Sequence, residues 1–202
     1  MKKYIIILLF TGIFLFSGYA ADCPCGEKGI AKHKRVHIKD RSMGNPADAT
    51  AFTFSQLYKL KITAAQLKQI NADSALVLPN ENQVISITGY LRILKLSADD
   101  CDLHMEIAAD KNPVSNRIIA EIPNTAEYCP LRQQVFDELS SQYNLTEKKL
   151  YKFGTKQLKA LPKVTVYGYV FFDNGHPTGH NHGSIYVKTI WEVHPVFKVE
   201  WD

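Results

Sequence analysis

The sequence lacks a strong excess of charge of either sign. Its 202 residues include 24 lysines and arginines against 20 aspartates and glutamates, a formal net charge of +4. Two of the positive residues, Lys2 and Lys3, lie in a leader that we expect to be removed, so the mature chain carries a net charge of about +2. A charge this small permits contact with a polyanion but gives no reason to expect one.

Several motifs that announce a particular chemistry are also missing. Ser115 and Ser184 do not sit in the G-x-S-x-G turn that exposes a nucleophilic serine. The chain has no glycine-rich loop of the kind that cradles phosphates, and no internal repeat. The sequence therefore gives no support to a serine nucleophile of that class or to a phosphate-binding loop.

A long apolar run occurs only near the start, at residues 4–16. Lys2 and Lys3 precede it, and the small residues Gly18 and Ala20 follow, which is typical of a secretory signal peptide (residues 1–20). The run is too short to favour a spanning helix. We therefore expect an exported protein, periplasmic or secreted, with no stable membrane span after cleavage. The rest divides into a flexible segment, 21–50, which has no apolar periodicity, and one domain, 51–202.

Only four cysteines are present, and an exported chain is expected to pair them. Four cysteines allow three pairings. We favour Cys101–Cys129, because the strand hairpin predicted below brings those two positions close together. Cys23 and Cys25 are one residue apart and would form a strained ring with each other, so free, metal-binding and intermolecular states stay open for them.

Apolar patterns predict a mainly β fold. Five strands are expected, at residues 84–97 (with a bend at Gly89), 102–108, 116–123, 163–172 and 190–201. A helix is expected at 130–143, and one or two shorter helices at 53–71. This order is that of an OB-fold, a five-stranded Greek-key barrel with one helix between strands 3 and 4, here with an N-terminal helical extension. A generic α+β sandwich is the alternative.

Closure of such a barrel would gather polar residues from distant segments. The third strand of an OB-fold closes against the fifth, and period-two alternation directs the polar residues of strands 2, 3 and 5 away from the apolar ones. We expect an exposed face of imidazoles and carboxylates, next to the loop that follows strand 4. Its members are Asp102, His104, Glu106, Glu121, Glu192 and His194, with Asp173, His176, His180 and His182 from that loop.

This combination of side chains indicates a chemical site, although each alone has a simpler interpretation as a solvated histidine, a turn or a cross-strand pair. Imidazole and carboxylate together suit Zn²⁺ or another divalent metal. They can also act as general acid and base without metal. The predicted metal ligands are Asp102, His104, Asp173, His176, Glu192 and His194. The predicted catalytic residues are His104, Glu121, His176 and His194.

The stretches "DLHMEI", "IIAEIP", "VYGYVFFDNGHPTG" and "WEVHPV" carry four short motifs: D-x-H (with Asp102), A-E-I-P, F-D-x-x-H and E-x-H-P-V. Over residues 84–199 the chain resembles a group of exported, largely uncharacterised bacterial OB-fold-like proteins with these motifs. The resemblance implies an OB-like fold and a shared site, and it implies no particular reaction. The shared polar positions are Asp102, His104, Glu121, Asp173, His176, Glu192 and His194.

Three functional hypotheses follow. The leading one is a metal-assisted or acid/base hydrolase with a phosphodiester-type substrate. The second is a non-catalytic binding module for nucleic acid, glycan or protein, in which aromatic residues and Arg92, Lys95 and Arg117 would line an exposed groove. The third is a structural network in which the histidines and carboxylates hold the loop to the barrel.

Overall fold

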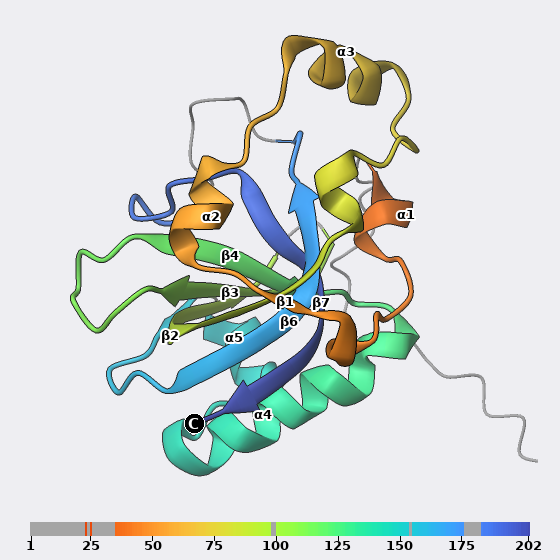
Figure 1. Cartoon of the computed structure of the whole chain (residues 1–202). Helices are drawn as coiled ribbons and strands as arrows, with labels where there is room; N and C mark the ends of the chain where they lie inside the picture. The colour runs from red at the N-terminus through yellow and green to blue at the C-terminus, as the bar shows by residue number, and fades with distance from the viewer. Residues whose placement is uncertain (1–22, 24, 26–34, 98–99, 154, 176–182) are drawn as a thin grey trace, which may run out of the picture.

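The computed structural model describes residues 23, 25, 35–97, 100–153, 155–175 and 183–202. At its centre is a closed five-stranded β-barrel (Figure 1). The barrel strands are β2 (Val84–Leu96), β3 (Leu103–Ala108), β4 (Arg117–Ile122), β6 (Lys163–Phe172) and β7 (Trp191–Trp201). They follow the order β2-β3-β4-β7-β6, and pairing of β2 with β6 closes the ring. The OB-like prediction is confirmed.

Short helices and strands surround the barrel. The helices are α1 (Val36–Lys39), α2 (Phe54–Lys59), α3 (Ala64–Ala72), α4 (Cys129–Tyr143) and α5 (Glu147–Phe153), with 3₁₀ turns η1 (Pro46–Asp48), η2 (Pro79–Asn82) and η3 (Ala126–Tyr128). Two short strands, β1 (Thr50–Ala51) and β5 (Lys156–Gln157), pair with β2. The region 53–71 forms two helices because Thr53 and Thr63 each start one with a capping box.

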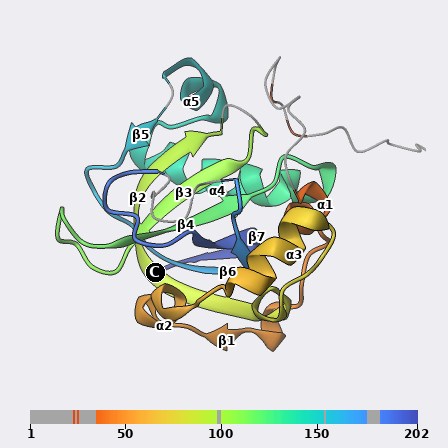
Figure 2. The ribbon, with the colours of Figure 1, turned by 90° about the horizontal axis from the view of Figure 1, so that it is seen from above.

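The bend in β2 lets one strand serve both sides of the barrel. Residues 84–90 pair with β6, and residues 90–96 pair with β3 (Figure 2). The change of partner occurs at Tyr90, which pairs with both strands. At the adjacent Gly89, a Cβ atom would lie 2.6 Å from the carbonyl oxygen of Ala108. Only glycine tolerates so close an approach, so the predicted bend at Gly89 is confirmed.

The core fills the barrel and continues under α4. Inward residues of β3, such as Leu103 and Met105, belong to one cluster with Leu131, Val135 and Phe136 of the helix. The helical stripe therefore faces the barrel, as its spacing predicts. The other residues of β3, β4 and β7 point out of the barrel. The parallel pairing of β4 with β7, in which Ala120 lies opposite Val193, places these outward residues side by side.

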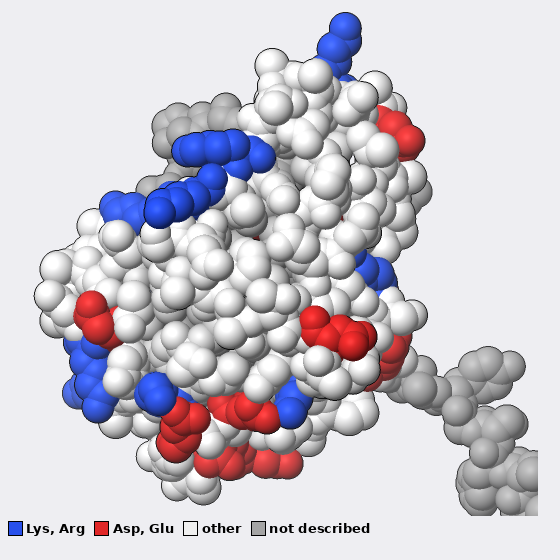
Figure 3. Space-filling view, in the orientation of Figure 1, with Lys and Arg blue, Asp and Glu red and all other residues white. Residues whose placement is uncertain are grey.

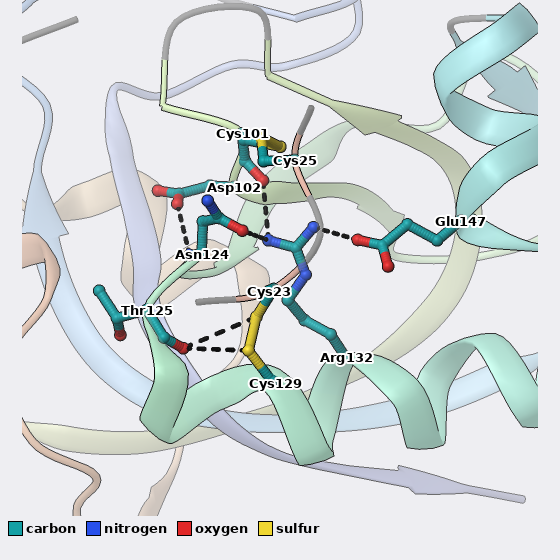
Figure 4. Close-up of a disulfide and its surroundings, with 9 residues drawn as sticks. All are labelled: Cys23, Cys25, Cys101, Asp102, Asn124, Thr125, Cys129, Arg132 and Glu147. Carbon is teal, nitrogen blue, oxygen red and sulfur yellow. Dashed lines mark hydrogen bonds and ion pairs between the residues drawn. A yellow bond between two sulfur atoms is a disulfide. The ribbon is translucent and has the colours of Figure 1, made fainter. Parts of the chain in front are cut away.

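The disulfides correct the predicted Cys101–Cys129 bond. Cys23 pairs with Cys129, and Cys25 pairs with Cys101, with Cα–Cα distances of 5.1 and 6.1 Å (Figure 4). Both distances are ordinary for a disulfide. The hairpin does bring positions 101 and 129 into one region. Each of these two cysteines is nevertheless bonded to a cysteine near the N-terminus. Local spacing in the sequence cannot reveal partners that lie so far away along the chain.

Residues 23, 25 and 35–50, the described part of the segment predicted to be flexible, are called here the N-terminal segment, and they contact the barrel. Arg35 is 1% exposed and makes a bidentate pair with Glu81, with both N–O distances 2.6 Å. It also donates to the carbonyl oxygens of Leu76 and Phe172. A guanidinium whose two terminal nitrogens are bonded to a carboxylate and to carbonyl oxygens can be buried without a large cost, and here it fastens the segment to the barrel.

The predicted signal peptide, residues 1–20, lies outside the described residues. Within the part of the chain that is described, no helix is long and apolar enough to cross a bilayer. Two disulfides are typical of an oxidising compartment. Export stays a prediction consistent with them.

We expect peptide mapping without reduction to exclude a direct Cys101–Cys129 bond and to link both of these cysteines to the N-terminal peptide. Trypsin cleaves between Cys101 and Cys129, so the expected product is one species in which the peptide with Cys23 and Cys25 is joined to two others, one carrying Cys101 and one carrying Cys129. Mass spectrometry identifies that species. Recovery of a peptide pair joined directly through Cys101 and Cys129 would contradict the structure.

Candidate functional site

Three adjacent strands place polar side chains on the outside of the barrel. β3 and β4 run antiparallel with His104 opposite Glu121, and β7 lies beside β4. Opposite residues share a face while neighbours along a strand alternate, so the polar residues of all three strands project to one side. Together they form what we call the His/carboxylate cluster: Asp102, His104, Glu106, Glu121, Glu192 and His194.

The cluster is buried, which corrects the prediction of an exposed face. His194 has no exposed surface, and Glu121, the most exposed of the six, is 5% exposed. Strand alternation determines the side to which a residue points and says nothing of what lies over that side. Here Gly183 covers Glu106 so closely that a Cβ atom would lie 2.8 Å from Oε1. Charges buried this deeply have to be paired.

Glu121 links the two histidines. Its Oε1 lies 2.6 Å from Nδ1 of His104, and its Oε2 lies 3.0 Å from Nδ1 of His194. A carboxylate only accepts, so Nδ1 of His104 carries the proton and donates it. That bond fixes the His104 ring, with Nε2 3.9 Å from Oε1 of Glu106.

His194 lies at the centre of the cluster. Its Nε2 is 3.4 Å from Oδ2 of Asp102, and its Nδ1 is 3.5 Å from Oε2 of Glu192. Among the described residues, neither ring nitrogen has a partner in hydrogen-bonding geometry. The ring of Phe171 packs on the imidazole, with centroids 5.4 Å apart. The imidazole is therefore surrounded by acidic oxygens without being fully bonded to any of them.

Three members of the cluster have the composition of a metal site. One ligand atom each from Asp102, Glu121 and His194 lies within 4.8 Å of the others. Zn²⁺ binds such oxygen and nitrogen atoms at about 2.0–2.2 Å, which places ligands of one ion about 3–4 Å apart. Small side-chain shifts would bring these three atoms to that spacing. We call these three residues the ligand group.

Lys39, at the end of α1, brings a positive charge to the ligand group. Its Nζ lies 2.7 Å from Oδ2 of Asp100, and 3.7 Å from both Oδ2 of Asp102 and Oε2 of Glu121. Burial acts to lower the pKa of Lys39, but the carboxylates of Glu121, Asp102 and Asp100 together raise it above its ordinary value. The amine therefore stays protonated, as an internal counter-ion.

Asp102 is positioned by the turn that precedes β3. Cys101 has a φ of 62°, in the left-handed region, and is bonded to Cys25. Arg132 donates to the Cys101 carbonyl oxygen at 2.8 Å, and the backbone N–H of Asn124 donates to Oδ1 of Asp102 at 3.0 Å (Figure 4). The disulfide and the Arg132 bond thus fix the turn at Cys101, and the Asn124 bond fixes the carboxyl group of Asp102 itself.

Glu106 closes the other end of the cluster. Arg117 donates to its Oε2 at 3.0 Å. Ser184 donates twice, from its backbone N–H to Oε1 at 2.7 Å and from its hydroxyl to Oε2 at 2.6 Å. Burial acts to raise the pKa of Glu106, but the nearby His104 imidazole, Ser184 and Arg117 lower it to about 2. This end of the cluster therefore holds the loop before β7 to the barrel.

Burial and neighbouring charges give the three residues of the ligand group pKa values that differ widely from their ordinary ones. Burial and the charge of Lys39 act to lower the pKa of His194, but Glu121, Glu192 and Asp102 raise it to about 10. Burial raises the pKa of Asp102 well above its usual range. Burial acts likewise on Glu121, yet Lys39 and the two histidines lower its pKa well below its usual range. Two nearby carboxyl groups with separated pKa values are what an acid and a base require.

The structure brings five of the predicted site residues together: Asp102, His104, Glu121, Glu192 and His194. Asp173 is not in the ligand group; its Oδ1 accepts a hydrogen bond from the N–H of Gly175 at 2.8 Å, which is turn geometry. His176, with His180 and His182, lies outside the described residues, so its predicted role is neither supported nor opposed.

Two residues beside the His/carboxylate cluster escape prediction from the sequence. Lys39 lies in a segment without apolar periodicity, and Asp100 is a turn residue before β3. One signal was present: Cys25 is in the same segment as Lys39, and Cys101 directly precedes Asp102. A Cys25–Cys101 bond places the segment that carries Lys39 beside the site.

The exposed basic groove expected of a binding module is not formed by its predicted arginines. Arg92 is 5% exposed and donates to the carbonyl oxygen of Asn112, and Arg117 is occupied by Glu106. On the face seen in Figure 3, positive side chains gather at the upper left, while both signs mix along the lower edge. No field of one sign covers this face.

Comparison of the chain with protein-family models, with curated proteins and with solved structures gives no match. The fold and the site define a small OB-like β-barrel with a buried His/carboxylate cluster, which is compatible with binding or with catalysis. Its chemistry has to be deduced from its side chains.

We expect Glu106→Gln to lower the free energy of unfolding by about 3–5 kcal/mol near neutral pH, because the buried Arg117 loses its charge partner. A carboxyl group whose pKa is lowered on folding, here from 4.5 to about 2, stabilises the fold above its unfolded pKa and loses that effect as pH falls through its folded pKa. The difference between wild type and variant should therefore narrow below pH 4.5 and vanish towards pH 2.

Denaturant titrations at several pH values measure this difference. The exposed Glu127 provides a matched control, and Glu127→Gln should change stability little. A Glu106→Gln deficit that stays constant down to pH 2 would show that the ion pair is not its source.

Proposed function

We propose that the protein is a metal-dependent hydrolase, with a phosphodiester-type substrate, whose centre is the ligand group Asp102, Glu121 and His194. The observation that supports this most is the convergence of their ligand atoms within 4.8 Å, in a buried setting where the imidazole nitrogens of His194 lack well-formed hydrogen bonds. A bound ion would displace the proton that the raised pKa keeps on this imidazole, and the freed nitrogen would be its ligand.

The donor set suits a catalytic rather than a structural metal. Structural zinc is usually held by four cysteine and histidine ligands, whereas catalytic zinc has three protein ligands and an open position. Two carboxylates and one imidazole also suit Mn²⁺. All four cysteines are in disulfides and are therefore unavailable as ligands. Zn²⁺ and Mn²⁺ are thus the ions to test.

The neighbouring side chains have roles in this proposal. His104 donates to Oε1 of Glu121 and so orients that carboxylate, as outer partners of metal ligands do. Glu192, beside Nδ1 of His194, orients the imidazole. A divalent ion bound here would lower the pKa of a water molecule and polarise a phosphoryl oxygen.

Water is the nucleophile that the site favours. The cysteines are bonded, and the hydroxyl of Ser184 donates to Glu106. Phosphodiesters are a substrate class for which a metal-held water suffices without a protein nucleophile.

A second candidate mechanism uses the same residues without metal. The pKa of Asp102 is raised and that of Glu121 is lowered, so Asp102 would act as the acid and Glu121 as the base. Activity that survives exhaustive chelation would favour this mechanism, and activity restored only by added metal would favour the first.

We expect Asp102→Asn and His194→Ala to abolish metal binding measured by calorimetry, and to reduce hydrolysis of an activated phosphodiester by more than about 100-fold. The loss should exceed the 10–100-fold typical of outer partners because these side chains would bind the ion directly. Asp173→Asn is the matched control, since Asp173 lies outside the ligand group, and it should keep both properties.

The circular dichroism spectrum and the melting temperature of each variant show whether it is folded. If a folded Asp102→Asn protein binds metal and hydrolyses substrate like wild type, the ligand group is not the centre.

A further inference from the structure

Lys39 and a metal ion would compete for the same two oxygen atoms. Nζ of Lys39 lies 3.7 Å from Oδ2 of Asp102 and 3.7 Å from Oε2 of Glu121. These are the oxygens that approach His194, at 3.4 and 3.0 Å respectively. Two cations a few ångströms apart repel strongly in a buried site, so the ligand group cannot hold a divalent ion tightly while the ammonium stays in place.

We propose that Lys39 is the resident cation of the ligand group and gates it, so that a divalent ion binds when the lysine side chain withdraws. The inference rests on the metal centre of the proposed function and adds the element that controls its occupation. The ammonium satisfies the carboxylates in the metal-free protein, which explains how Asp102 and Glu121 are buried together beside the partly exposed Asp100.

The position of Lys39 suits a gate. Its side chain is 13% exposed, while the side chain of Asp102 is 3% exposed, so the lysine lies at the rim between the cluster and solvent. Its four-carbon stem is flexible and its ammonium is readily hydrated, which permits it to swing outward without unfolding α1. The nearest carboxylate, Asp100, is also the more exposed one, at 17%, and can follow it.

The backbone that carries Lys39 is fixed on both sides of this residue: the Tyr128 hydroxyl donates to the carbonyl oxygen of Arg41, two residues after Lys39, at 2.5 Å. Arg35 is buried against Glu81 four residues before Lys39. The Cys25–Cys101 disulfide fastens the same segment directly beside Asp102 (Figure 4). Movement is thereby confined to the side chain, so the geometry assigns the gate to the lysine itself rather than to the whole N-terminal segment.

The test measures binding of Mn²⁺ and of Zn²⁺ by calorimetry to the oxidised full chain and to three variants. Lys39→Met removes the charge, Lys39→Gln removes it but keeps a hydrogen-bond donor for the carboxylates, and Lys39→Arg keeps it. We expect both neutral variants to bind at least about tenfold more tightly than wild type, and Lys39→Arg to bind as weakly as wild type. Lys61→Met, at an exposed lysine, is the matched control and should match wild type.

A stability measurement covers the case in which a neutral variant folds poorly. Without metal, Lys39→Met should melt at a lower temperature than wild type, and Mn²⁺ should raise its melting temperature more than that of wild type. Equal affinities in wild type and both neutral variants would overturn the gate while leaving the metal centre. Absence of binding in every protein, with no metal-dependent rise in melting temperature, would overturn the metal centre and the gate with it.

Discussion

Ionised carboxylates are very costly to bury unless positive charge is buried with them, and this constraint shapes the structure outside the barrel core. The outer side of β3, β4 and β7 carries Asp102, Glu106, Glu121 and Glu192, none of which is more than 5% exposed. The barrel supplies two histidines and Arg117 as partners. The remaining charge comes from Lys39, so the N-terminal segment is required to complete the site.

The fold and the composition of the site were accessible from the sequence because both depend on short-range patterns. Period-two alternation in residues 102–108 and 116–123 defines two strands and the direction of His104 and Glu121. The capping residues and the apolar stripe define α4 and the N-terminal helices. The OB-fold order then places β7 beside β4, which brings His194 to Glu121 without any further information.

The covering of the site and the disulfide partners were not accessible, because they depend on contacts between residues far apart in sequence. Cys25 and Cys101 are 76 positions apart, and nothing local distinguishes that pair from Cys101–Cys129. The segment around Lys39 has the sequence pattern of a polar tail. It binds to the rest of the protein mainly through the charge of Lys39 and the buried guanidinium of Arg35, and it has no apolar stripe. Burial of the cluster, and with it the chemistry of a desolvated site, depends on that segment and on the loop that carries Gly183 and Ser184.

The most direct test of the account is the structure of crystals soaked with Mn²⁺ or Zn²⁺, read from the anomalous signal of the ion. The account predicts a peak at about 2.0–2.2 Å from oxygens of Asp102 and Glu121 and a ring nitrogen of His194, with the Lys39 side chain turned to solvent. A peak found only at other histidines, with Lys39 still paired to Asp100 and the ligand group unchanged, would contradict it.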